Sequence, residues 1–315
     1  DVIIKELRDK NLYTSLTDNG AGGLSSSVGE MAKESGGFII NLDLVPLKYS
    51  GMHPWEIWIS ESQERMTMAV PPKNEKKVIK LLNKRGVEAT VIGKFVKTSK
   101  AIIKYKNIEI LNMDMSFLHE GYPRKVFKSR KPILIKKPYK EKKIDNYSNN
   151  LLKILSSPNI ISKEFVSSQY DHEVQGTSII KPLQGIGKVF SDATVIKPIF
   201  KSSKCVGLSQ GIYPNYTNLD SYNMAAHSID TAIRNLIVTG CDLSNIALLD
   251  NFCWCSPEEP ERIYQLKKSL EACYDLSIFF QTPFISGKDS MYNDFNGYDK
   301  KNNKIKISIP PTLLI

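Results

Sequence analysis

The chain has 315 residues, of which 41% are hydrophobic and 24% charged, and these values are ordinary for a globular protein that buries an apolar core. No run approaches the roughly 18 consecutive apolar residues of a membrane-spanning helix, and the first residues show no signal-peptide pattern. The net charge of +10 arises mostly between residues 121 and 143, which hold ten Lys and Arg residues and one acid. The length predicts two domains of ordinary size.

Residues 1–120 mix helical and strand patterns. We expect helices at 2–11, 24–33 and 75–85 and strands at 56–60, 66–70, 87–95 and 101–105. A glycine-rich turn over 18–23 precedes the second helix, and Gly86 closes the third. This mixture predicts a layered α+β or α/β domain.

Residues 121–148 form a basic linker in this interpretation. Pro132 and Pro138 interrupt the charged run, which is typical of a solvated connector. The alternative is an arm that contacts RNA, because clustered Lys and Arg attract phosphates. The scarcity of aromatic residues that would stack on bases disfavours this alternative.

Residues 149–315 make up the second predicted unit. Helices are expected at 149–155, 220–238 and 260–276, and strands at 178–182, 193–198, 205–209 and 246–250. We expect the 246–250 strand to deliver Asp250 at its end, and a further strand from residue 284 to run into a turn at Gly287. The chain starts without Met and stops within an apolar run, so we expect a piece of a longer polypeptide, with this unit truncated.

The cysteines and histidines suggest no catalytic centre of their own. The five cysteines are odd in number, which argues against a disulfide framework. Cys253 and Cys255 lack the spacing and further ligands of a zinc site, so reduced, packed thiols are favoured over a metal or redox pair. His227 lies in the apolar 220–238 helix and is predicted to be a packed core residue. We assign no catalytic residue to this chain.

Three places combine carboxylates with glycine or other polar groups next to predicted strands, a pattern that suits phosphate and Mg²⁺. They are DNGAGGLS at 18–25, SESQER at 60–65, and the pair LDNF at 249–252 with GKDS at 287–290. Each place also has a purely structural alternative. The 18–25 segment could be a tight turn with Asp18 as a helix cap, the 60–65 segment a solvated loop, and the last pair two unrelated loops. No Walker A or G-x-G-x-x-G motif occurs, so the residues alone indicate only a magnesium-nucleotide enzyme.

These motifs resemble those of the synthetase subunit of phosphoribosylformylglycinamidine synthase, and they keep that family's order. The resemblance also includes PWEIWISESQERM at 54–66, QYDHEVQG at 169–176 and PFISGKDS at 283–290. It implies two related halves that share the fold of aminoimidazole ribonucleotide synthetase. Residues 1–120 would be the C-terminal α/β domain of the first half, and 149–315 the N-terminal α+β domain of the second.

The resemblance also implies roles for individual residues. Asp18 resembles a magnesium ligand, Asp250 and Gly287 resemble ATP contacts, and Ser290 resembles a substrate contact. The loop that contacts formylglycinamide ribonucleotide would hold Glu61, Ser62 and Gln63, and the phosphate loop would hold Gly20, Gly22 and Gly23. Many bacterial members have a magnesium-binding Asn where Lys288 stands. An ammonium group cannot bind a cation, so Asp289 is the alternative metal ligand, and Lys288 would instead neutralise phosphate charge.

The implied reaction is the ATP- and Mg²⁺-dependent conversion of an amide to an amidine in purine biosynthesis, in the cytoplasm. Ammonia would come from a glutaminase subunit or domain, and the family's catalytic histidines would lie outside this chain, which we expect to be inactive alone. The alternatives are a related ATP-dependent synthetase for aminoimidazole ribonucleotide or selenophosphate, and a non-catalytic RNA-binding module. The Glu61–Gln63 loop and the order of the two units disfavour the related synthetases.

Overall fold

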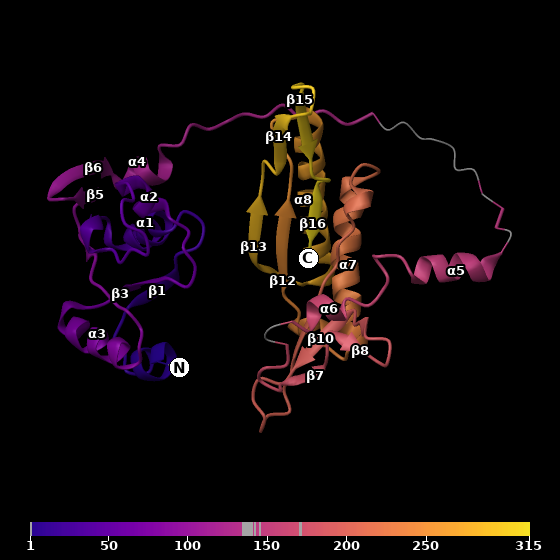
Figure 1. The fold of residues 1–315 in the computed structure, drawn as a ribbon, viewed down its shortest axis with the longest axis horizontal. Coiled ribbons are helices and arrows are strands. Elements are labelled where there is room, and N and C mark those ends of the chain that lie inside the picture. The colour runs from indigo at the N-terminus through magenta and orange to yellow at the C-terminus, as the bar shows by residue number, and fades with distance from the viewer. Residues whose placement is uncertain (1, 134–140, 142, 145, 170–171) are drawn as a thin grey trace. The chain divides into compact units, whose positions relative to one another are not determined.

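The chain folds into two units, residues 1–125 and 126–315. The computed structural model describes residues 2–133, 141, 143–144, 146–169 and 172–315. Figure 1 labels the main elements of both units. The division falls slightly beyond the predicted boundary at residue 120. The assignment of the units to two halves of a repeated architecture remains a prediction, as does the linker role of 121–148, because four of its lysines (Lys136, Lys137, Lys140 and Lys142) fall outside the described residues.

The first unit holds a four-stranded sheet of order β4-β2-β5-β6 and a separate antiparallel pair, β1 and β3. Its strands are β1 (Ser15–Asp18), β2 (Phe38–Asn41), β3 (Met66–Ala69), β4 (Gly93–Phe95), β5 (Lys100–Tyr105) and β6 (Ile108–Asp114). Its helices are the π-helix η1 (Val2–Arg8), α1 (Leu24–Ser35), α2 (Pro54–Ile59), α3 (Glu75–Lys84) and α4 (Met115–Glu120), with short 3-10 turns η2 (Leu42–Leu44) and η3 (Pro72–Asn74).

Two apolar cores stabilise this unit. The larger one joins α1, α2 and α4 to β2 and β5, with Val28, Phe38 and Ile57 almost fully buried. The smaller one packs Leu7 of η1 against Val78 and Leu82 of α3. The mixed α/β character expected from the sequence is confirmed.

One predicted strand of the first unit is wrong. Residues 56–60 lie mostly in helix α2, which begins with Pro54 at a position where its missing N–H costs nothing. Glu56 closes the start of this helix by accepting a hydrogen bond of 2.7 Å from the backbone N–H of His53. A short apolar run cannot distinguish a strand from a buried helical turn, and here the capping signals were the better guide. The predicted 87–95 strand also shrinks, to Gly93–Phe95.

The second unit is built on a three-stranded sheet of order β13-β12-β16, packed against two long helices. Its helices are α5 (Tyr147–Leu155), α6 (Glu164–Ser167), α7 (Ser221–Val238) and α8 (Pro260–Phe280), with 3-10 turns η4 (Pro214–Tyr216) and η5 (Leu243–Asn245). Its strands are β7 (Ser178–Ile180), β8 (Leu183–Gln184), β9 (Val189–Phe190), β10 (Ala193–Ile196), β11 (Val206–Ser209), β12 (Leu248–Cys253), β13 (Phe284–Ser290), β14 (Asp294–Tyr298), β15 (Lys304–Ser308) and β16 (Thr312–Leu314).

Helix α7 follows the expectation closely. Asp220 caps it by accepting a hydrogen bond of 3.0 Å from the N–H of Asn223, and its apolar face buries Met224, Ile229 and Ile233. These side chains share a core with Phe252 of β12 and Ala272 of α8.

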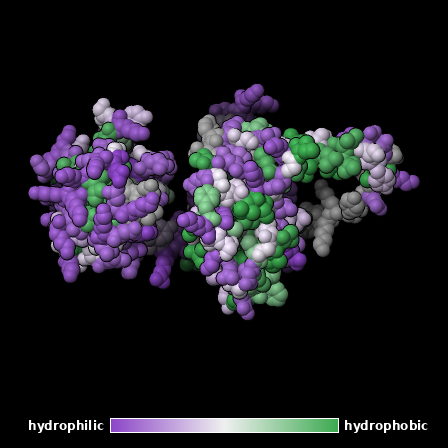
Figure 2. All heavy atoms as spheres, turned by 90° about the horizontal axis from the view of Figure 1, so that it is seen from below, coloured by the Kyte–Doolittle hydropathy of each residue, from purple (hydrophilic) through white to green (hydrophobic). Residues whose placement is uncertain are grey.

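The surfaces of the two units differ in character. Figure 2 shows apolar side chains gathered on the second unit, whereas the visible face of the first is mostly polar. Helix α5 contributes exposed Leu151, Leu152 and Ile154. Among the described residues, no helix has both the length and the apolar character required to cross a membrane.

Candidate active site

The glycine-rich turn starts where β1 meets β3. Asp18, the last residue of β1, pairs with Met66, and the next N–H, of Asn19, donates a 3.0 Å hydrogen bond to the carbonyl of Arg65. The turn therefore begins directly beside the 60–65 segment. The alternative role of Asp18 as a helix cap is contradicted, because Gly23 occupies the cap position of α1 and no side chain caps it.

Two of the three predicted places meet in this unit. The N–H of Gly22 donates a 3.0 Å hydrogen bond to Oε1 of Glu61, so the glycine turn and the Glu61 loop form one surface. Gly23 makes this approach possible, since a Cβ at that position would lie 1.9 Å from the carbonyl oxygen of Ser60. Gly23 also has a φ of 56°, which favours glycine.

A small polar network beneath the turn fixes its position. The hydroxyl of Thr67 donates to Oδ1 of Asn19 at 2.7 Å and lies 3.0 Å from the hydroxyl of Ser27 on α1. Asn19 and Ser27 are buried, so these bonds satisfy polar groups that water does not reach. Local sequence patterns indicate no role for these residues, because a contact between β3 and α1 leaves no trace in the neighbouring residues.

The third predicted place is a pair of parallel strands. Asp250 of β12 lies opposite Gly287 of β13, and Cys253 lies opposite Ser290. The two motifs therefore do come together, which contradicts the alternative of unrelated loops. Asp250 and Gly287 do not stand at strand ends, however. Asp250 lies within β12, and β13 continues through Gly287 to Ser290.

The predicted turn at Gly287 is thus wrong, and the glycine has another physical role. A Cβ on Gly287 would lie 2.2 Å from Oδ1 of Asp250, so the Asp250 carboxylate rests over the space that a side chain would fill. A glycine within a strand often marks such a close approach.

Alternation along these strands sorts the predicted residues between two faces. Paired residues share a face, which puts Asp250, Gly287 and Asp289 on one side and Lys288 and Ser290 on the other. Burial, and then the charge of Asp289, raise the pKa of Asp250 above its ordinary value. Lys288 therefore does not lie beside the Asp250 carboxylate, and the two carboxylates form a negatively charged spot.

The other candidates found in the sequence remain structural. All five cysteines are free thiols, with Cys255 and Cys273 buried as expected and Cys205 exposed. The prediction that His227 is a packed core residue is wrong: His227 is exposed, although its ring lies 5.6 Å from that of Tyr216. Within the described ranges, no group of three or more His, Cys, Asp or Glu side chains is placed to hold a metal by itself.

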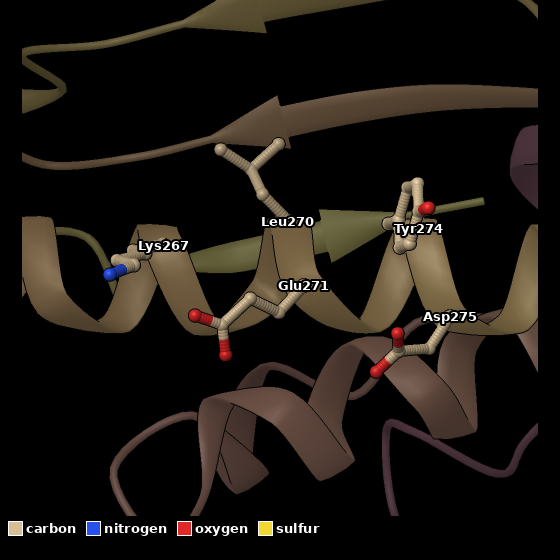
Figure 3. A pocket seen from close by; sticks show the side chains of 5 residues that line it. All are labelled: Lys267, Leu270, Glu271, Tyr274 and Asp275. Atoms are coloured by element: carbon tan, nitrogen blue, oxygen red, sulfur yellow. The ribbon is translucent and has the colours of Figure 1, made fainter.

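The surface of α8 in the second unit carries a hollow. Figure 3 shows its lining side chains, all from that helix: Lys267, Leu270, Glu271, Tyr274 and Asp275. None of them is a predicted site residue. Asp275 accepts a 2.9 Å hydrogen bond from the hydroxyl of Tyr222 on α7, so its carboxylate links the two helices.

Comparison with known proteins gives the same family as the motifs. Residues 1–106 match the family described as AIR synthase related protein, C-terminal domain. The chain is 36% identical over 296 residues to phosphoribosylformylglycinamidine synthase subunit PurL of Picrophilus torridus, a match that covers 92% of this chain and 39% of that protein. It is also 36% identical over 284 residues to PurL of Methanocaldococcus jannaschii, covering 89% and 37%.

Solved structures agree on the fold. The structure of PurLQS from Thermotoga maritima matches with a TM-score of 0.72 and 23% identity, over 97% of this chain and 46% of that one. The T. maritima PurL complexed with FGAR matches with a TM-score of 0.70 and 22% identity. The resemblance drawn from the motifs is therefore confirmed: over most of its length this chain is similar to PurL, and it spans about two fifths of the length of these relatives.

Proposed function

We propose that this chain is a portion of an ATP-dependent phosphoribosylformylglycinamidine synthase, a carbon–nitrogen ligase of purine biosynthesis. The similarity to PurL along most of the chain supports this. The single structural observation that carries it is the hydrogen bond between the N–H of Gly22 and the carboxylate of Glu61. This bond joins the proposed phosphate loop to the proposed substrate loop.

In this proposal the first unit binds the substrate and one metal. Glu61, Ser62 and Gln63 would contact formylglycinamide ribonucleotide, and Asp18 would hold Mg²⁺. The turn that contains Gly20, Gly22 and Gly23 would receive phosphate oxygens. The turn already donates a hydrogen bond to a carboxylate oxygen of Glu61, which supports the proposal that the turn can bind an anion.

The second unit would contribute to nucleotide binding. Asp250 and Gly287 are the proposed ATP contacts, Asp289 the second metal ligand and Ser290 a substrate contact. The raised pKa of Asp250 beside Asp289 supports a cation site here, because a metal ion would relieve the repulsion between the two carboxylates. Lys288 and Ser290 lie on the other face of the sheet, so Lys288 would act on a different part of the ligands.

The proposed carboxylates can hold Mg²⁺ only if the bound substrates supply further oxygen atoms. Mg²⁺ commonly binds through one or two carboxylates plus substrate phosphates. The described residues offer single carboxylates, such as Asp18, and the pair Asp250 and Asp289, but no group of three or more. When bound, the metal would neutralise charge on the transferred phosphoryl group. The protein's own part is to hold the nucleotide and the amide in line, which lowers the entropic cost of reaction.

The reaction class follows from the chemistry of an amide. Its oxygen is a poor leaving group, so transfer of the γ-phosphoryl group of ATP to that oxygen, with release of ADP, makes it displaceable. Ammonia then attacks the carbon that bears this phosphorylated oxygen. Phosphate leaves and the incoming nitrogen loses a proton, which gives the amidine. We propose that a glutaminase subunit or domain supplies the ammonia and that the enzyme works in the cytoplasm.

The proposal is tested by changing Asp18→Asn in the full-length protein, with ammonium chloride as the nitrogen source. We expect about a 100-fold lower kcat and a higher Mg²⁺ requirement, because a catalytic metal supplies several kcal/mol of charge stabilisation. Asp9→Asn, an exposed carboxylate of the same unit, is the control and should leave turnover unchanged. Wild-type turnover in Asp18→Asn would refute the metal assignment, and absence of amidine formation by the wild-type protein would refute the function.

A further inference from the structure

The loop that carries Glu61 is held from its C-terminal side by a residue to which neither the motifs nor the proposed function gave a role. Arg65 immediately precedes β3 and folds its side chain back over the loop. Its Nε donates a 3.1 Å hydrogen bond to the carbonyl of Ser62, and its Nη2 donates to the carbonyl of Ser60. One guanidinium group therefore bridges the two backbone carbonyls that flank Glu61.

Arg65 is also tied to the glycine-rich turn. Its own carbonyl accepts the 3.0 Å hydrogen bond from the N–H of Asn19, the residue that follows Asp18. The same residue thus contacts the substrate loop through its side chain and the proposed phosphate turn through its backbone. Because these contacts leave the loop ends little freedom, the Glu61 carboxylate is kept within reach of the Gly22 N–H.

The character of the arginine matters for this bridge. A guanidinium group presents several N–H donors in a rigid plane, so it can serve two carbonyls at once, whereas the ammonium of lysine is a single flexible point. Arg65 is partly buried, and burial lowers the pKa of its guanidinium group below the ordinary value. An arginine remains protonated at neutral pH even so, and its charge strengthens both hydrogen bonds.

The other contacts of the loop are weaker restraints. The hydroxyls of Ser60 and Ser62 lie 2.9 Å apart, and the side-chain amide of Gln63 donates to the carbonyl of Glu61 at 3.0 Å. These bonds lie within the loop and move with it. The contacts of Arg65 and the Gly22–Glu61 hydrogen bond, by contrast, connect the loop to β3 and to the glycine-rich turn.

We infer that Arg65 is a positioning residue that fixes the Glu61–Gln63 loop for binding the ribonucleotide substrate, without touching that substrate itself. This inference rests on the proposed function for its substrate and on the geometry for its mechanism. It predicts a defect specific to one substrate: the KM for formylglycinamide ribonucleotide rises, while the KM for ATP stays close to the wild-type value.

The test compares Arg65→Met and Arg65→Lys in the full-length protein, with Arg85→Met as the matched control. Arg85 lies in the same unit and pairs with Glu6, away from the loop. We expect Arg65→Met to raise the KM for formylglycinamide ribonucleotide at least about tenfold, the factor that corresponds to a free-energy change of 1.4 kcal/mol. Arg65→Lys should recover part of this loss, and Arg85→Met should show none of it.

Amide hydrogen exchange on the same variants, without ligands, provides a readout that does not depend on activity. We expect faster exchange at the amides of residues 22 and 60–65 in Arg65→Met, and unchanged exchange in α3. An unchanged KM in an active Arg65→Met enzyme, or unchanged exchange across the loop, would overturn the inference. If the wild-type protein formed no amidine, the proposed function would fail, and the exchange result would still decide whether Arg65 holds the loop.

Discussion

At the scale of single residues, two glycines show how this chain makes room for carboxylates and carbonyls. Gly287 leaves the space over which the Asp250 carboxylate lies, and Gly23 lets the carbonyl of Ser60 approach α1. The sequence marked both glycines as candidates for contacting ligands. What local sequence could not reveal is that each also has a partner in this chain, since those partners are 37 residues away in each case.

The partly buried carboxylate of Asp250 leads to a prediction about stability. Because burial and the charge of Asp289 raise its pKa, the folded protein holds this proton more tightly than the unfolded chain does. The contribution of Asp250 to the stability of the folded protein therefore falls as the pH rises above 3.8, the ordinary pKa of an Asp side chain, and stays low at neutral pH. We expect Asp250→Asn to raise the Tm at pH 7, with the advantage shrinking as the solution is acidified.

Thermal unfolding of the full-length protein between pH 4 and pH 7 checks this prediction. Asp192→Asn, which changes an exposed carboxylate of the same unit, should shift the Tm little at any pH. A lower Tm for Asp250→Asn at neutral pH would mean that the surroundings of Asp250 stabilise its charge, which is the opposite of what burial and Asp289 should do.

At the scale of elements, the sequence was most informative where signals reinforced one another. Helix α7 combines a broad apolar face with the Asp220 cap, and both its existence and its start were predicted. Helix α2 is short, and the order of its apolar residues suggested a strand, although Pro54 and Glu56 are helix-start signals. The pairing of β12 with β13 was only a possibility in the sequence, because hydrophobic periodicity reports which face is buried and not which strand lies alongside.

The junction between α1 and the end of α2 allows a matched comparison of two glycines. A Cβ at Gly23 would collide with the backbone of Ser60, whereas one at Gly36, the C-cap of the same helix, would meet nothing within 4 Å. Gly36 lies in the left-handed region, so Gly36→Ala should cost about 1–2 kcal/mol from backbone conformation alone. Gly23, with φ 56° and ψ −131°, combines a conformation that side chains adopt even less readily with the collision at Ser60. We expect Gly23→Ala to cost clearly more than this in the free energy of unfolding measured by denaturant titration. Equal costs would show that both the backbone of residue 23 and the close approach of Ser60 relax freely.

At the scale of the whole molecule, the chain consists of two units that each carry a part of the proposed machinery. The sequence motifs indicated the family, the mixed α/β fold and the candidate residues, because such motifs keep their order along the chain. They could not indicate the internal support of the site, since Arg65, Asn19, Thr67 and Ser27 act through contacts between separate elements. The RNA-binding alternative for the basic segment stays untested, and residues 134–140, 142 and 145 of that segment lie outside the described residues.

The most direct test of the central claim is the equilibrium affinity of the full-length protein for formylglycinamide ribonucleotide, measured by calorimetry for Glu61→Ala and Glu64→Ala. Glu61 accepts the hydrogen bond from Gly22, and Glu64 is an exposed neighbour in the same loop. For Glu61→Ala we predict a Kd at least about tenfold higher than that of the wild-type protein, consistent with loss of a hydrogen bond to a charged group. For Glu64→Ala we predict a nearly wild-type Kd. Equal affinities of the wild-type protein and both variants would contradict the claim that the glycine turn and the Glu61 loop form one substrate site.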